Sequence, residues 1–387
     1  MNARSPLVLL FLALTIAGCA HSKRERANRK RPSRIENAPL TITFFDLGQA
    51  DGMLIRYQGK TLLMDSGESR IEDDAQRVHH ISKALEEAGN TTLDAFVVSH
   101  YHRDHVGDPK PRSGMWMLFD DGVSIRTLYD RGEVIYGGGG KGETQREYEK
   151  ALPGWLSSGK VKAHQSVKVG DLIPLGDGLT VEVVAVNGNG RLEALDQKDP
   201  SELQHFPASE NDYSVALKVT YGDFELFAGG DLTGSTKHRD FKGHREGYHD
   251  IESSTAVRVG DVEIYRADHH GSQHSSNPCF LKVLRPEVSI ISSGENSYGH
   301  PTPRVFDALQ EYGRVYITGG ADPKVKAHVA PGLVEDDVVV AVEAGGKRFS
   351  VNGKDFRAKS EEQEAAVPDR VTECAEKPMT HVDSDNE

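Results

Sequence analysis

The feature that most constrains this chain is a run of three histidines and one aspartate within six residues. The run, His-Tyr-His-Arg-Asp-His at residues 100–105, directly follows a short, mostly apolar segment at residues 95–99. That segment predicts a buried strand, so the run is expected where the strand ends and the chain turns. Side chains two residues apart on an extended segment project to the same side, so His100 and His102 are expected to converge on one cation.

Asp104 and His105 follow past the expected turn and are predicted to face a second cation beside the first. Imidazole and carboxylate ligands without a thiolate suit Zn²⁺, Mn²⁺ or iron rather than a structural zinc site. The alternative is a solvated loop whose histidines bind nothing. The density of the run disfavours that alternative.

The rest of the sequence predicts paired strands first, and then strands that alternate with helices. Strands are expected at residues 40–45, 53–57, 61–64, 95–99, 124–128, 179–186, 214–221, 224–228, 262–266, 288–291, 338–344 and 347–351, and helices at residues 73–88, 144–152, 278–284 and 302–312. This order is typical of an α/β fold in which packed sheets are covered by helices on the outside. The glycine-rich stretch at about residues 108–209 is interpreted as an insertion.

The N-terminus predicts an export signal. Arg4 precedes a mostly apolar run at residues 7–17, which ends in Ile-Ala-Gly-Cys at residues 16–19. The run is too short to span a bilayer, which takes about 20 residues. A charged start, an apolar middle and small residues predict a signal peptide over residues 1–18, the alternative being a core helix.

Charged residues are distributed unevenly along the chain. The first 34 residues carry eight Lys or Arg and one Glu, whereas the other 353 carry 58 acidic and 38 basic side chains. Residues 19–38 are interpreted as a basic tether, either a solvated spacer or a segment that contacts anionic lipid or nucleic acid. Residues 39–353 are predicted to fold, and residues 354–387 to form an acidic disordered tail. The net negative charge of the residues after 34 excludes tight nucleic-acid binding by bulk charge alone. Bound cations or a local basic strip would be needed.

The histidine run resembles the signature of the metallo-β-lactamase superfamily, His-x-His-x-Asp-His after a buried strand. Met-Asp-Ser-Gly at residues 64–67, Gly-Gly-Asp-Leu at 229–232 and His-His-Gly-Ser at 269–272 extend the likeness in the family's order. The resemblance covers about residues 40–320. It implies an αββα sandwich of two mixed sheets with helices on both outer faces, and two divalent cations, Zn²⁺ or Mn²⁺.

The same resemblance assigns the ligands. One cation would be held by Asp104, His105, Asp231 and His270, and the other by His100, His102 and the bridging Asp231. Asp65 would brace the loop at the end of its strand.

Further motifs resemble the hydrolase domain of ComEC-type competence proteins, which is associated with phosphodiester cleavage. They are Phe-Asp-Leu-Gly-Gln-Ala-Asp-Gly at residues 45–52, Glu-Asn-Asp-Tyr-Ser-Val-Ala-Leu at 210–217, His-His-Gly-Ser at 269–272 and Gly-Glu-Asn…Tyr-Gly-His-Pro at 294–301. The membrane channel of those proteins is not expected here, so DNA uptake is not implied. Where many superfamily members carry a third histidine for the first metal, this sequence has Asn211, Asp212 and Ser214.

Three residues are candidates for contact with substrate: Asp104, His269 and His300. His300 is expected to donate to a phosphoryl oxygen or to protonate the leaving group, the alternative being a loop histidine that caps the helix from residue 302. For His269 three roles stay open: supporting a ligand, facing the substrate, or acting as a swapped ligand.

Ile-Ala-Gly-Cys also resembles a bacterial lipobox, which implies that Cys19 becomes lipidated. Ala20 then resembles an outer-membrane sorting residue, so the expected location is membrane-anchored, on the periplasmic side of the outer membrane or at the cell surface. Cys279 and Cys374 either pair, as an oxidising compartment permits, or are unrelated thiols.

Taken together, these features predict an exported binuclear metal hydrolase that acts on phosphodiesters, either nucleic acid or a phosphorylated envelope component. The alternative is the same fold acting on an ester or amide, such as a β-lactam, a lactone or a phosphorylcholine-type substrate. A third hypothesis is a metal-stabilised binding module without turnover. The natural substrate, the physiological metal and the oligomeric state are not predicted.

Overall fold

Two β-sheets form the centre of the computed structural model, which describes residues 37–67, 76–132, 142–188, 209–234 and 250–359. The first sheet has nine strands in the order β15-β14-β13-β1-β2-β3-β4-β5-β6, and the second has six in the order β12-β11-β10-β9-β8-β7. Both sheets are mixed, since β1 pairs antiparallel with β2 while β3 pairs parallel with β4, and β8 pairs antiparallel with β9 while β9 pairs parallel with β10.

The strand bounds follow the predicted apolar segments closely at the N-terminal end. The first sheet consists of β1 Leu40–Phe44, β2 Met53–Tyr57, β3 Lys60–Met64, β4 Thr92–Val97, β5 Ser124–Asp130, β6 Val161–Ser166, β13 Val338–Val342, β14 Arg348–Val351 and β15 Lys354–Arg357. The second consists of β7 Thr180–Ala185, β8 Ala216–Tyr221, β9 Phe224–Ala228, β10 Ile264–Arg266, β11 Val288–Ile291 and β12 Arg314–Ile317.

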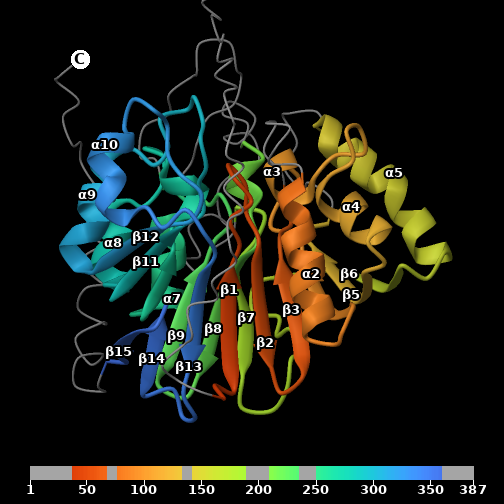
Figure 1. The fold of residues 1–387 in the computed structure, drawn as a ribbon, viewed down its shortest axis with the longest axis horizontal. Coiled ribbons are helices and arrows are strands. Elements are labelled where there is room, and N and C mark those ends of the chain that lie inside the picture. Colours follow the sequence, from red (N-terminus) through yellow and green to blue (C-terminus); the bar gives the residue numbers. More distant parts are fainter. Residues whose placement is uncertain (1–36, 68–75, 133–141, 189–208, 235–249, 360–387) are drawn as a thin grey trace, which may run out of the picture. The chain divides into compact units, whose positions relative to one another are not determined.

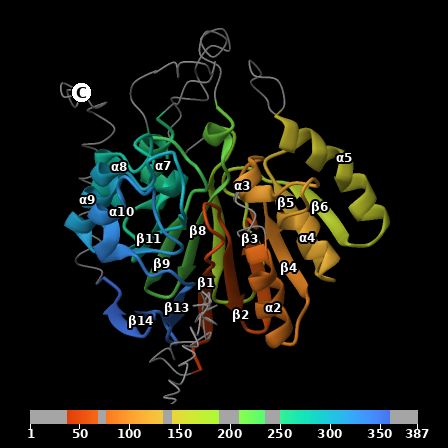
Figure 2. The same ribbon diagram turned by 45° about the horizontal axis from the view of Figure 1, so that its top comes forward.

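Helices cover the outer face of each sheet (Figures 1 and 2). On the first sheet lie α2 His79–Glu87, α4 Gly114–Asp120 and α5 Glu143–Ser157, whose apolar side chains share one core cluster with residues of β2 to β6. On the second lie α7 Glu252–Val259, α8 Pro278–Leu284 and α9 Pro303–Tyr312, with α10 Lys326–Val329 beside them. The predicted αββα sandwich is therefore confirmed.

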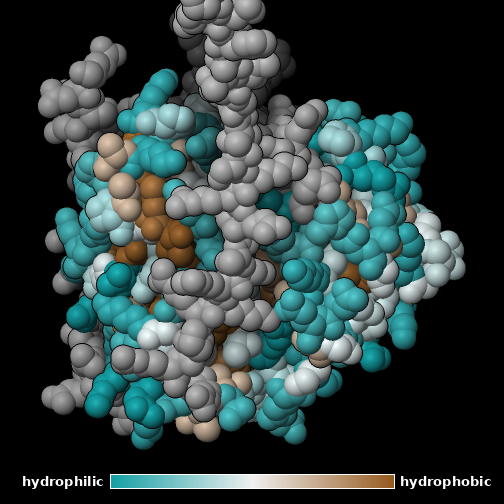
Figure 3. Space-filling view, in the orientation of Figure 1, coloured by the Kyte–Doolittle hydropathy of each residue, from teal (hydrophilic) through white to brown (hydrophobic). Residues whose placement is uncertain are grey.

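Strand alternation explains why each sheet buries both of its faces. In β2, Met53, Ile55 and Tyr57 point into the core between the sheets, whereas Leu54 points into the core under the helices. Period-2 alternation places successive side chains on opposite faces, so an apolar residue at nearly every position supplies both cores. On the face drawn in Figure 3, the described residues over α4 and α5 are mainly hydrophilic, because the apolar sides of these helices face the sheet.

The predicted insertion was wrong for its described part. Residues 108–209 contribute β5 and β6 to the first sheet and β7 to the second, so this stretch belongs to the central fold. Its strands were hard to predict because β6 has only one buried residue, Val161, and therefore lacks an apolar alternation. Residues 133–141 and 189–208 lie outside the described part.

The predicted boundary at residue 354 was also wrong. Strand β15 pairs antiparallel with β14, and Phe356 stacks on Phe349 with ring centroids 5.2 Å apart. Beyond the strand, the buried Lys359 ammonium donates to the Val262 carbonyl at 2.8 Å and forms ion pairs with Asp261 and Glu287. These contacts join residues 72 to 98 positions apart, which a polar sequence segment cannot reveal.

The signal peptide, the tether, Cys19 and Cys374 lie outside the described residues. Cys279, at the start of α8, is disulfide-bonded. Its pairing with Cys374 stays a prediction. None of the helices in the described part of the chain combines the length and apolarity that a membrane span requires.

Packing between the sheets generates a stability prediction. Phe224 of β9 lies edge-on to Phe349 of β14, with centroids 5.3 Å apart, and both are fully buried. Phe224→Ala is expected to lower the free energy of unfolding by about 3–5 kcal/mol, because it leaves a cavity in the core. Urea denaturation followed by circular dichroism measures this loss. Leu172→Ala, at a side chain 64 % exposed, is the control and should change stability by less than about 0.5 kcal/mol.

Candidate metal centre

The loop after β4 brings the histidine run to the edge of the first sheet. Its backbone stays extended through His102 (φ −76°, ψ 155°), and the short helix α3 Arg103–Val106 then begins. As expected for an extended segment, His100 and His102 approach each other, with Nε2 of the first 3.1 Å from Nδ1 of the second. The turn into α3 directs Asp104 and His105 to a neighbouring position.

Asp231, in the loop after β9, stands between two groups of imidazoles. Its Oδ1 lies 3.2 Å from His105 Nε2 and 3.7 Å from His270 Nε2. Its Oδ2 lies 3.8 Å from His100 Nε2 and 3.7 Å from His269 Nε2. The carboxylate is buried and therefore has the geometry of a bridge between two adjacent ligand groups.

The last histidine pair belongs to the short helix η3 Asp268–Gly271, which follows β10. His270 Nδ1 donates to the Ser292 carbonyl at 2.8 Å, and this contact presents Nε2 to the centre. That Nε2 lies 3.2 Å from Asp104 Oδ2. The Asp104 side chain is 32 % exposed, whereas His270 is buried, so Asp104 lies at the open side of the group.

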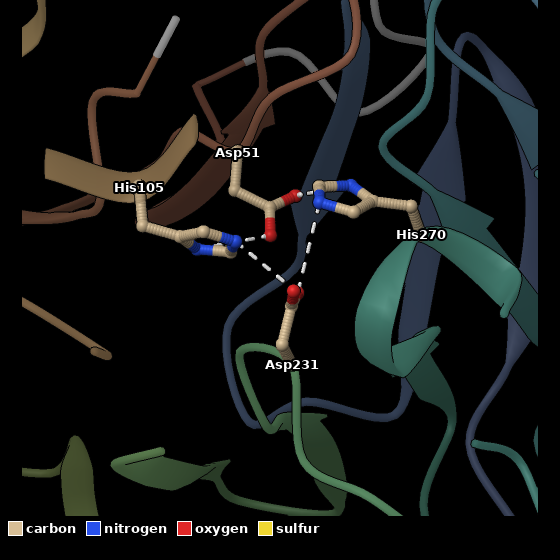
Figure 4. A group of neighbouring side chains, drawn as sticks. All are labelled: Asp51, His105, Asp231 and His270. Carbon is tan, nitrogen blue, oxygen red and sulfur yellow. Dashed lines mark ion pairs between the residues drawn. The ribbon is translucent and has the colours of Figure 1, made fainter. Parts of the chain in front are cut away.

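Two sets of side chains can hold a metal ion. The first set is Asp51, His105, Asp231 and His270 (Figure 4), and one ligand atom from each residue lies within 4.8 Å of the others. The same holds for the second set, His100, His102 and Asp231. The structure thus brings together all six residues predicted as ligands, although Asp104 stands beside the first set through His270 rather than within it.

Asp51 is the member of this centre to which sequence reasoning assigned no role. Its oxygens lie 3.4 Å from His105 Nδ1 and 3.8 Å from His270 Nδ1, on the ring side away from Asp231. The buried Arg266 guanidinium forms an ion pair with the same carboxylate. Asp51 therefore places a carboxylate beside two of the imidazoles at once. The signal in the sequence was its place in the motif at residues 45–52, which resembles ComEC-type proteins but was not interpreted residue by residue.

Asp65 lies where the resemblance places it, directly after β3. Its Oδ1 accepts a hydrogen bond from the Ser99 backbone N–H at 2.8 Å, and its Oδ2 lies 2.9 Å from His105 Nδ1. The residue has a left-handed backbone (φ 61°), which is uncommon outside glycine and found at constrained sites. A carboxylate on Nδ1 fixes the ring so that Nε2 is left for a metal.

A buried arginine joins the histidine run to the segment around Asn211. The Glu210 carboxylate accepts from the Tyr101 backbone N–H at 2.8 Å and from Arg131 Nη2 at 2.7 Å. The Arg131 guanidinium also lies over the rings of Tyr101 and Tyr213, at 4.4 and 5.1 Å from their centroids. This network fixes the backbone between His100 and His102.

His300 lies at the edge of the imidazole group. Its ring centroid is 5.4 Å from that of His269 and 6.4 Å from that of His270. The capping role considered for it was wrong, because Thr302 is the N-cap of α9. The loop around His300 is held by Asn296, whose side chain bonds the His300 backbone N–H at 3.1 Å and carbonyl at 2.7 Å.

The electrostatics of the centre favour positive charge beside its buried carboxylates. Burial opposes the charge on Asp231, yet the neighbouring histidines hold the pKa of that carboxyl well below its usual range. Burial likewise opposes the charge on His105, but Asp231 and Asp65 raise the pKa of its imidazole well above the ordinary value. The centre therefore keeps its carboxylates ionised only with positive charge beside them.

Buried polar atoms without hydrogen bonds also support the fit of a cation to this centre. Within the described residues, His105 Nε2, Asp231 Oδ1 and Asn211 Oδ1 are buried and make no hydrogen bond. Such groups are rare in native structures and cost about 1–3 kcal/mol each unless an ion or water satisfies them. Nitrogen and oxygen ligands without sulfur match Zn²⁺, Mn²⁺ or iron.

Comparison with known proteins agrees with this geometry. The family profile described as the metallo-beta-lactamase superfamily matches residues 45–110, which contain Asp51, Asp65 and the histidine run. The comparison thus supports the resemblance to the metallo-β-lactamase superfamily that the histidine run predicted. The family match and the ligand sets together confirm the predicted class of metal-dependent hydrolase.

Curated relatives confirm the resemblance to competence proteins. The chain is 26 % identical over 284 residues to ComE operon protein 3 of Bacillus subtilis, covering 70 % of this chain and 30 % of that protein. It is 26 % identical over 286 residues to competence protein ComA of Neisseria gonorrhoeae, covering 73 % of this chain and 31 % of that protein. The chain thus matches just under a third of the length of these relatives.

Among solved structures, the metallo-beta-lactamase fold protein YhfI of Bacillus subtilis aligns with 72 % of this chain and 96 % of its own, at 13 % identity and a TM-score of 0.42.

The contacts of Asp51 predict that it supports metal binding. Asp51→Asn is expected to weaken the metal that His105 and His270 would hold by about 10–100-fold, as loss of a carboxylate behind ligating histidines does. Isothermal titration of the metal-free protein with Mn²⁺ or Zn²⁺ measures the change. Asp307→Asn, at an exposed ion pair with His328, is the matched control and should leave affinity unchanged. Equal metal affinities in the two variants would show that Asp51 does not support metal binding.

Proposed function

We propose that this chain is an exported, binuclear, metal-dependent phosphodiesterase. The observation that supports this best is the Asp231 carboxylate, whose two oxygens face separate groups of imidazoles at 3.2 to 3.8 Å. Two divalent cations, Zn²⁺ or Mn²⁺, are the occupants that we assign to these groups. When bound, such a pair lowers the pKa of water and neutralises charge on an attacked phosphoryl group.

Asp104 is suited to handle a proton at the open side of the centre. Burial opposes its charge, but the contact with His270 and the nearby His105 lower the pKa of this carboxyl, so it is ionised at neutral pH. An ionised, partly exposed carboxylate accepts a proton from an attacking water rather than supplying one. We therefore assign Asp104 as the proton acceptor.

His300 is suited to bind a phosphoryl oxygen. Burial and the imidazoles of His269 and His270 hold the pKa of His300 well below its ordinary value, so the ring is neutral. A neutral imidazole donates an N–H hydrogen bond but is a weak source of protons at neutral pH. Of the two roles expected for His300, we therefore retain the donor to a phosphoryl oxygen.

A nucleic acid is the substrate that we favour. Tyr298 is 68 % exposed, and its ring centroid lies 5.9 Å from that of His300. An exposed aromatic ring beside a reacting centre is a surface on which a base can stack. The resemblance to ComEC-type proteins, associated with phosphodiester cleavage, points the same way, and bound cations would offset the acidic surface.

Hydrolysis tests the proposal. The chain from residue 35 onward, loaded with Mn²⁺ or Zn²⁺, is expected to cleave bis-p-nitrophenyl phosphate and single-stranded DNA but not nitrocefin. Asp231→Asn and His102→Ala should lower kcat/KM by at least about 10³-fold, since several kcal/mol of transition-state stabilisation depend on the cations.

Asp307→Asn is the control for this assay and should retain full activity. Cleavage of nitrocefin alone would contradict phosphodiester hydrolysis and favour the ester or amide alternative. Metal binding without turnover of any of these substrates would favour the binding module.

The proposal includes export and anchoring through lipid on Cys19, which rests on the charged, apolar and small-residue order of residues 1–19. Anchoring by several acyl chains is stable because each buried methylene contributes about 0.8 kcal/mol. Cells fed radiolabelled palmitate are expected to label the full chain but not its Cys19→Ser variant. Equal labelling of both would contradict lipidation at this residue.

A further inference from the structure

We propose that His269 is the third imidazole ligand of the cation held by His100 and His102, and replaces the histidine that many superfamily members carry near the position of Asn211. This inference rests on the proposed function, because it assigns a ligand of the same centre. The two ligand sets found above do not include His269.

Distances to Asp231 support the assignment. His269 Nε2 and His100 Nε2 lie 3.7 and 3.8 Å from the same carboxylate oxygen, Oδ2. His105 and His270 face the other oxygen, Oδ1. The carboxylate therefore faces His105 and His270 through Oδ1, and His100 and His269 through Oδ2. His102 lies beside His100, so His269 is the third imidazole on that side.

The backbone explains how two consecutive histidines reach opposite sides of one carboxylate. His269 (φ 49°, ψ 45°) and His270 (φ 53°, ψ 26°) both have left-handed backbones, and their ring centroids are 6.3 Å apart at an interplanar angle of 64°. This conformation costs a non-glycine residue roughly 1–2 kcal/mol, so it persists only where the surroundings impose it. If only His270 bound metal, a glycine at position 269 would relieve the strain. The strained position instead carries an imidazole whose Nε2 faces Asp231 Oδ2.

Asn211 provides the space that His269 occupies. The Asn211 amide Nδ2 lies 3.2 Å from His269 Nε2 and 3.4 Å from Nδ1, and Asn211 is buried. An amide is shorter than an imidazole, so the ring of His269 fits where a longer side chain at 211 would stand. The His269 backbone N–H also donates to the Gly230 carbonyl at 3.1 Å, which ties this loop to that of Asp231.

The neighbouring His300 offers a matched control. It belongs to the same group of imidazoles, with its ring 5.4 Å from that of His269. Within the described residues, however, it forms no ion pair with Asp231, whereas His269 does. A substitution at either position removes one partly buried imidazole, but only the change at 269 should remove a ligand.

Metal titration tests the assignment without reference to activity. The metal-free chain is titrated with Co²⁺ by calorimetry and by visible absorption, which reports the number and geometry of nitrogen ligands. We expect two equivalents in the unsubstituted chain and in His300→Ala. In His269→Ala one equivalent should bind at least about 10-fold more weakly and its absorption band should change, while the other stays unchanged.

A second variant separates loss of a ligand from loss of structure. Asn211→His in the His269→Ala background puts an imidazole back at the usual family position, and we expect it to restore the weakened equivalent. Should His269→Ala fail to fold, His269→Asp, which keeps a ligand atom, replaces it and should retain both equivalents within about 10-fold.

Two outcomes would overturn the assignment of His269 as a ligand, and only the second would also contradict the proposed function. Unchanged affinity and spectrum in His269→Ala would show that His269 is not a ligand, and the proposed function would stand. A chain that binds no metal before any substitution would contradict the proposed function, and the assignment of His269 would fall with it.

Discussion

Ionised carboxylates and imidazoles buried at one point are the constraint on which the rest of the structure depends. Asp51, Asp65 and Asp231 are all buried within 4 Å of His105, and the charge they carry cannot persist in a protein interior without positive charge beside it. Arg266 supplies one such charge, through its ion pair with Asp51. Cations between the imidazoles would supply the remainder.

The two sheets bring these carboxylates and imidazoles together. Asp65 and the histidine run follow β3 and β4 of the first sheet, whereas Asp231 and His270 follow β9 and β10 of the second. The loops pack so closely that a Cβ on Gly67 would lie 1.7 Å from the Asp104 carbonyl oxygen. Gly230 has a φ of 63°, and a Cβ there would approach the Ser99 side chain to 2.8 Å. Close backbone contact thus sets the positions of the ligands before any metal arrives.

Local pattern predicted those parts of the centre that neighbouring residues determine. His100 and His102 converge because an extended chain repeats every two residues, and that much follows from spacing alone. Asp231 and His270 lie in weak motifs, and their place was expected only from resemblance to a family. Asp51 received no role because its contacts, with Arg266 and two histidines, join segments that lie far apart in the sequence.

Local sequence pattern likewise predicts only those elements of the fold that neighbouring residues determine. Strands β1 to β3 were predicted within one residue because β1 alternates clearly and β2 and β3 are nearly continuous apolar runs. Strand β6 is exposed at five of its six residues, and β15 is stabilised by pairing with β14 and by the distant contacts of Lys359. In both cases tertiary pairing determines the element, and no local propensity shows it.

The central claim, that Asp231 bridges two cations, is tested most directly by anomalous diffraction from crystals loaded with Mn²⁺ or Zn²⁺, recorded at the absorption edge of the metal. The account predicts two peaks, one on each side of the Asp231 carboxylate, the first beside His100 and His102 and the second beside His105 and His270. No peak, a single peak, or peaks remote from Asp231 would contradict it.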